Sequence, residues 1–124
     1  MNNSKLDNRW KMGIQKDAGE LLMLCYERYR EGKETSIEEF KKVSGWDDVR
    51  IKNAGRHLFK TGLVYGPTSD QGDFKIVEVL PEGIRIVENE EIFESTFGIK
   101  LNLGVLSFSW DIRKKNNYKS ILNI

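Results

Sequence analysis

The spacing of apolar residues along the chain predicts a first helix that begins at Gln15 or Asp17 and ends at Arg30. Asp17 can cap its N-terminus, and Gly32 follows its end. Apolar side chains recur on one face of this helix at Ala18, Leu21, Leu22, Cys25, Tyr26 and Tyr29. A stripe of this kind normally faces a core, so we expect it to be buried. Residues 1–14 are polar, and we expect them to form a flexible basic arm.

Two shorter helices joined by a glycine-bearing turn are predicted next. Ser36 and Glu39 have the spacing of a capping box at the start of the first of them. Its apolar positions are Ile37, Phe40 and Val43. Gly45 can adopt the positive φ that ends a helix, and Asp47 can then cap a further helix over residues 47–61.

The helix over 47–61 has one apolar face and one polar face. The apolar face carries Ile51, Ala54, Gly55, Leu58 and Phe59. The opposite face carries Val49, Arg50, Lys52, Asn53, Arg56, His57 and Lys60. A glycine inside a helix costs about 1 kcal/mol relative to alanine. We therefore expect Gly55, together with Ala54, to let another helix cross this one closely.

A β-hairpin is predicted after this helix. Residues 63–65 form an apolar run that predicts one strand, and residues 74–80 predict a second. Residues 66–73 between them are rich in glycine, proline and aspartate, which is typical of a loop. The connector 33–35 before the second helix can supply a single further strand position.

The last third of the chain continues with a helical pattern and then changes period. Pro81 suits the first position of a helix, and apolar residues continue at mostly helical spacing to Gly98. From Ile99 to Trp110 the apolar residues alternate with polar ones, which predicts a strand or a strand pair. Residues 114–124 form a basic tail.

The order of these elements resembles a winged helix-turn-helix domain of the kind found in small bacterial and archaeal transcriptional regulators. The resemblance rests on Ser44-Gly45-Trp46-Asp47, on Ile51, Ala54 and Leu58 in register, and on Gly62-Leu63-Val64 leading into a strand. It implies an α+β fold in which residues 15–88 form a three-helix core with a β-hairpin wing. Residues 89–124 would then form a helical and strand-like C-terminal extension that packs on the core or dimerises.

The same resemblance implies binding of double-stranded DNA, with the 47–61 helix in the major groove. Base contacts are expected from the N-terminal part of that helix, at Val49, Arg50 and Asn53. Phosphate contacts are expected from cationic side chains, at Lys42, Lys52, Arg56 and Lys60. Domains of this type are commonly homodimers, so we expect a homodimeric transcriptional regulator. The apolar stretch from Ile99 to Trp110 either covers the core or pairs with a second copy.

The charge distribution leaves an alternative open. The whole chain has a formal net charge of only +1, although residues 1–16 and residues 111–124 each carry a net charge of +3. The predicted wing loop holds Asp70 and Asp73 where a DNA-binding wing usually has a basic side chain. A winged-helix protein–protein interaction module without DNA binding is therefore the second hypothesis.

Motifs for catalysis or metal binding do not occur in the sequence. The chain has one cysteine, Cys25, and one histidine, His57. It has none of the spacings typical of hydrolase nucleophiles, zinc ligands or phosphate-binding glycine loops. We expect no enzymatic activity, no metal and no cofactor, and the sequence indicates no particular small-molecule effector. Without a membrane-spanning apolar run or a secretion signal, a cytoplasmic protein is expected.

Overall fold

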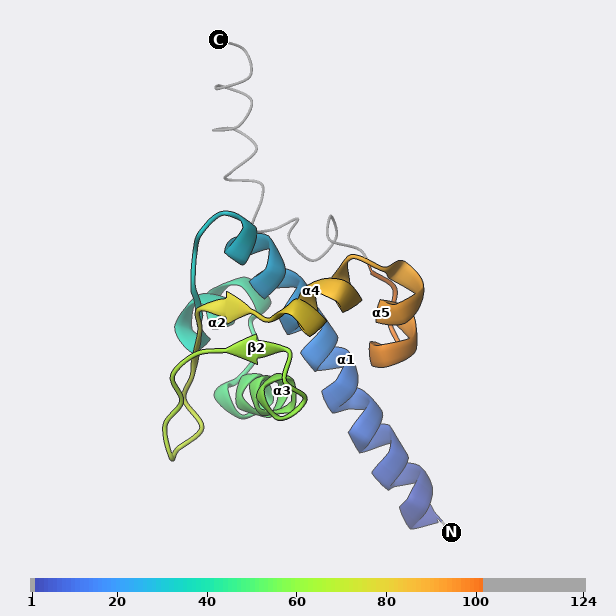
Figure 1. Ribbon diagram of the computed structural model, residues 1–124. Coiled ribbons are helices and arrows are strands. Elements are labelled where there is room, and N and C mark those ends of the chain that lie inside the picture. The colour runs from blue at the N-terminus through green and yellow to red at the C-terminus, as the bar shows by residue number, and fades with distance from the viewer. Residues whose placement is uncertain (1, 102–124) are drawn as a thin grey trace.

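The computed structural model describes residues 2–101, and the side chains of residues 13–101, as an α+β fold. The helices of this part of the chain are α1 (Asn2–Arg30), α2 (Ile37–Ser44), α3 (Asp48–Lys60), α4 (Pro81–Val87) and α5 (Glu90–Phe97). The strands are β1 (Thr35–Ser36), β2 (Val64–Tyr65), β3 (Lys75–Ile76) and β4 (Glu78–Val79). Figure 1 shows α1 running through the molecule, with α3 and the β2–β4 hairpin on one side of it and α5 on the other.

The caps predicted around the α2–α3 turn are confirmed. The Ser36 hydroxyl accepts a hydrogen bond from the backbone N–H of Glu39 at 3.2 Å. Gly45 ends α2 with φ +72°, a conformation that favours glycine. The Asp47 carboxylate accepts from the backbone N–H of Arg50 at 2.8 Å. Because each of these contacts joins residues close in sequence, the local pattern alone was enough to predict them.

The start of the first helix is a correction. The sequence predicted a flexible arm over 1–14 and a helix from Gln15 or Asp17, but α1 already begins at Asn2. Residues 2–16 contain no proline and only one glycine, so nothing in them breaks a helix strongly. Asp17 lies inside α1 and is not its cap, and the N-terminal half of α1 extends beyond the rest of the fold (Figure 1).

The predicted hairpin forms, but its second strand is divided into β3 and β4. β4 pairs antiparallel with β2, and β3 pairs antiparallel with β1, in two separate two-stranded sheets. β1 includes Thr35, as the connector prediction allowed. Between the Tyr65–Glu78 pair and the Thr68–Phe74 bridge, the second strand has one residue more than the first. An extra residue of this kind is a β-bulge, which interrupts the ladder and bends the strand.

The role predicted for Gly55 is also corrected. We expected it to let a second helix approach, but its neighbour is the aromatic ring of Phe74, next to β3. A Cβ atom at position 55 would lie 2.2 Å from Cε2 of that ring. Because position 55 has no side chain, the Phe74 ring can pack directly against α3.

The apolar pattern after the hairpin forms two helices instead of one. Asn89 separates them, because its side chain accepts a hydrogen bond from the backbone N–H of Ile92 at 3.1 Å and caps α5. Phe93 and Phe97 of α5 are buried in the same apolar core as α1, and a Cβ atom on Gly19 would lie 2.8 Å from Phe97. The predicted boundary after residue 88 thus falls between two helices that share one core.

The remaining predictions for the C-terminal third lie mostly outside the described residues. Of the strand predicted from Ile99 to Trp110, only residues 99–101 are described, and they are not in a strand. The rest of that strand and the basic tail 114–124 lie outside the described range. Within that range, no helix is both long enough and apolar enough to cross a membrane.

Candidate nucleic-acid interface

The exposed side of α3 carries four of the predicted DNA-binding residues in a single row. Val49, Asn53, Arg56 and Lys60 follow each other at spacings of three or four residues, which places them on one face of a helix. Val49 is 68% exposed, Arg56 and Lys60 are exposed, and Asn53 is half-buried. Arg56 Nη1 donates a hydrogen bond to Asn53 Oδ1 at 3.2 Å. We call this row the outer stripe of α3.

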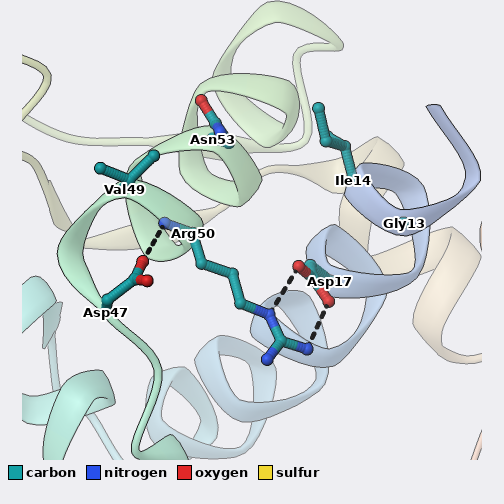
Figure 2. A pocket seen from close by; sticks show the side chains of 7 residues that line it. All are labelled: Gly13, Ile14, Asp17, Asp47, Val49, Arg50 and Asn53. Carbon is teal, nitrogen blue, oxygen red and sulfur yellow. Dashed lines mark hydrogen bonds and ion pairs between the residues drawn. The ribbon is translucent and has the colours of Figure 1, made fainter. Parts of the chain in front are cut away.

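Arg50 lies away from this stripe and is bound to α1. Its Nε and Nη2 donate to the two carboxylate oxygens of Asp17 at 2.8 and 3.0 Å, as Figure 2 shows. Its guanidinium also stacks on Trp46, 3.9 Å from the ring centroid. The hydrogen bond to Asp17 raises the pKa of Arg50 above its usual value. The predicted base contact by Arg50 remains a prediction, and it would require the guanidinium to leave Asp17.

Lys52 is also paired, on the opposite side of the outer stripe. Its Nζ lies 3.4 Å from the carboxylate of Asp73 in the hairpin loop, residues 66–73. Loop contacts hold Asp73 in place, because its backbone N–H donates to the Ser69 hydroxyl at 3.1 Å. The positive charge of Lys52, a predicted phosphate contact, is therefore paired with Asp73, one of the two aspartates that the sequence analysis noted in the wing loop.

The other predicted phosphate contacts have no ion-pair partner among the residues whose side chains are described. Within residues 13–101, no carboxylate lies within 4.0 Å of the charged groups of Lys42, Arg56 or Lys60. Lys42 is exposed on α2, and its neighbour Lys41 pairs with Asp48 at 3.0 Å. The unpaired cations near α3 are thus those of the C-terminal half of the outer stripe.

A shallow hollow of about 400 Å³ separates α1 from the N-terminal half of α3 (Figure 2). It is lined by Gly13, Ile14, Asp17, Asp47, Val49, Arg50 and Asn53. In Figure 2 the Arg50 side chain crosses from α3 to α1, whereas the side chains of Val49 and Asn53 point away from Asp17. The ion pair between Arg50 and Asp17 therefore forms one wall of the hollow and fixes α1 beside α3.

A second hollow, of about 220 Å³, lies between the C-terminal half of α3 and the hairpin loop. Its lining combines two cations, two hydroxyls and two aromatic rings. The lining residues are Arg56, Phe59, Lys60, Thr68, Ser69, Gly72 and Phe74. Phe59 and Phe74 contact each other edge to face, with ring centroids 5.8 Å apart. Guanidinium, ammonium and hydroxyl groups are the side chains that most often contact nucleic-acid phosphates.

Two residues of this region were not identified as functional from sequence. The sequence suggested Asp17 only as a helix cap, although it pairs with a residue 33 positions away. Glu20 lies near the same pair, and burial, followed by the charge of Asp17, raises its pKa. No local pattern indicates such contacts, because they depend on how α1 and α3 pack.

Other reactive side chains do not form a second site in the part of the chain that the structure describes. Cys25 is buried, and burial raises the pKa of its thiol to about 12. Among the described residues, no group of three His, Cys, Asp or Glu side chains is arranged to hold a metal ion. Comparisons of the chain with protein-family models, curated proteins and solved structures found no match.

Proposed function

We propose that this protein is a winged helix-turn-helix transcriptional regulator that binds double-stranded DNA, with α3 in the major groove and the hairpin as the wing. The observation that carries the proposal is the outer stripe of α3. Figure 1 shows α3 itself between the hairpin loop and the N-terminal half of α1. A helix with its side chains is about 10–12 Å across, and the major groove is about 12 Å wide.

The order of residues along the outer stripe agrees with this placement. Recognition helices contact base edges with their N-terminal residues, which here are Val49 and Asn53. Arg56 and Lys60 follow toward the C-terminus and share a hollow with the hydroxyls of Thr68 and Ser69, which supports a role for them in phosphate binding. Lys42 on α2 would add a further phosphate contact, as would Lys52 once it leaves Asp73.

A homodimer is part of the proposal. Each copy offers few unpaired cations near α3, and the net charge is only +1, so one copy alone would bind DNA weakly. Two copies on two half-sites would double the number of phosphate contacts. A cytoplasmic location follows from access to chromosomal DNA.

The salt dependence of binding to random duplex DNA tests the proposal. A protein that contacts about six phosphates loses roughly a thousandfold in affinity between about 50 and 200 mM salt. The double substitution Arg56→Ala with Lys60→Ala is expected to weaken binding and to lower the slope of log affinity against log salt by about 2 per copy. Lys33→Ala is the control, because Lys33 is exposed in the loop between α1 and β1, and Figure 1 shows that loop away from α3.

Two results would contradict the proposal. Absence of binding at low salt would favour the alternative, a protein–protein interaction module, which the Lys52–Asp73 and Arg50–Asp17 pairs support because they neutralise cations beside α3. Equal losses in the double variant and in Lys33→Ala would show that α3 is not the contacting element.

A further inference from the structure

We infer that Asp17 sets the base preference of the proposed DNA site: by holding Arg50 on α1, it leaves Val49 and Asn53 to read an A·T-rich step. This inference rests on the proposed DNA binding and adds to it the class of sequence that is bound. It assigns Asp17, which lies on α1, as a specificity-determining residue that acts through Arg50.

The first step concerns Arg50, which is held away from base contact. Arginine is the side chain that most often recognises guanine, through two hydrogen bonds to O6 and N7. Nε and Nη2 of Arg50 instead donate to the two oxygens of Asp17, so its guanidinium is held against α1. Stacking on Trp46 and the negative charge of Glu20 further hold the guanidinium there. Binding a guanine would therefore break two charge-assisted hydrogen bonds.

The second step concerns what remains at the N-terminal end of α3. Val49 is 68% exposed and apolar, and an apolar side chain in the major groove contacts the methyl group of thymine. Asn53 carries an amide, which pairs with N6 and N7 of adenine. Because the two residues are four apart, they lie about 6 Å from each other on one helix face. Successive bases rise about 3.4 Å along a strand, so these side chains can reach bases at most two steps apart.

The other polar residues of this half of α3 are already engaged. Asp48, whose carboxylate could accept from cytosine, pairs with Lys41 at 3.0 Å. Lys52, which could donate to guanine, pairs with Asp73. Asn53 Oδ1 accepts a hydrogen bond from Arg56, and a carbonyl oxygen has a second lone pair with which to accept from adenine. The groups left for base contact are thus those that favour A·T pairs.

Selection from a pool of random duplexes by the full-length protein, followed by sequencing, tests this inference. The wild type is expected to enrich adjacent A·T pairs. Val49→Ala should lose the thymine preference and Asn53→Ala the adenine preference, each by at least about fivefold, the lower end of what one such contact contributes. Asp17→Asn should release Arg50 and enrich guanine at a neighbouring position, whereas Lys33→Ala should leave the profile unchanged.

The outcomes separate this inference from the proposed function. If no duplex is retained at low salt, both are overturned. If duplexes are retained but the wild type enriches guanine beside α3, or Asp17→Asn has the wild-type profile, only the inference is overturned. Arg50→Ala gives an independent test should Asp17→Asn not fold: an unchanged base profile supports the inference, and loss of a guanine preference overturns it.

Discussion

At the scale of single residues, Gly55 shows how a contact between distant segments determines which side chain is tolerated. The glycine lies inside α3, where alanine would stabilise the helix by about 1 kcal/mol. Alanine would, however, place its Cβ atom 2.2 Å from the ring of Phe74. The sequence indicated that something packs closely at this position, but it could not indicate what.

Gly55→Ala is therefore expected to destabilise the fold, by up to about 2 kcal/mol. Overpacking of a filled core costs about 1–3 kcal/mol, and the helix propensity of alanine offsets part of that. Gly13→Ala is the control, because among the described residues no heavy atom outside the backbone of α1 itself and the two residues next to Gly13 lies within 4 Å of the new Cβ, and it should gain up to about 1 kcal/mol. Urea unfolding measures both, and equal stabilisation by the two variants would disprove the packing explanation.

Glu20 gives a prediction about pH. Burial and the charge of Asp17 raise its pKa in the folded protein, and Arg50 lowers it by less. Between the unfolded pKa and the higher folded pKa, the folded protein binds more protons than the unfolded one does. The free energy of unfolding therefore falls as pH rises through this range. Glu20→Gln should thus be more stable than the wild type at neutral pH, and the difference should shrink as pH falls through the raised pKa toward the usual value.

Urea unfolding over a series of pH values measures this difference. Glu91→Gln removes an exposed carboxylate from α5 and serves as the control. A Glu20→Gln variant that is less stable than the wild type at neutral pH would show that attraction to Arg50 outweighs the cost of burial.

At the scale of elements, the hairpin loop and α3 are joined by opposite charges. Asp73 of the loop forms an ion pair with Lys52 of α3, and the ring of Phe74 packs against Gly55. The caps of α2 and α3, at Ser36 and Asp47, were predicted because they depend on neighbouring residues. The start of α1 was not predicted, because polar composition does not separate an arm from a helix that has no breaker.

Asp73→Asn is expected to strengthen DNA binding. The substitution removes a negative charge beside the proposed interface and releases Lys52, so the salt slope should become steeper by up to about 1 per copy. Fluorescence anisotropy with a labelled duplex at several salt concentrations measures the change. Glu90→Gln makes the same charge change on α5, away from α3, and an equal gain in both variants would show only a general charge effect.

At the scale of the whole molecule, α5 belongs to the same core as the helices before it. Phe93 and Phe97 are 0% and 1% exposed, and both lie in one apolar cluster with residues of α1, α2 and α3. Arg28 links the C-terminal end of α1 to the residues that follow it. Its side chain donates to the backbone oxygen of Glu34 at 2.8 Å and forms an ion pair with Glu39 of α2. The described helices should therefore unfold together.

Phe93→Ala should lower the free energy of unfolding by about 3–5 kcal/mol, the usual cost of removing a buried aromatic ring. Circular dichroism and tryptophan fluorescence during urea unfolding should follow one shared transition. Tyr65→Ala is the control, since Tyr65 is 62% exposed and should change stability by no more than about 0.5 kcal/mol. A small effect of Phe93→Ala, or two separate transitions, would mean that α5 is an independent extension.

The sequence by itself determined the helix–turn–helix order, the caps of α2 and α3 and the residues that lie on the polar face of α3. These depend on backbone preferences and on hydrogen bonds between near neighbours, which a local pattern contains. Only the tertiary structure decided which of those polar residues remain unpaired, because Asp17 reaches Arg50 and Asp73 reaches Lys52 across separate elements. Such ion pairs depend on distances between packed elements, and these distances are fixed only when the core around α1 forms.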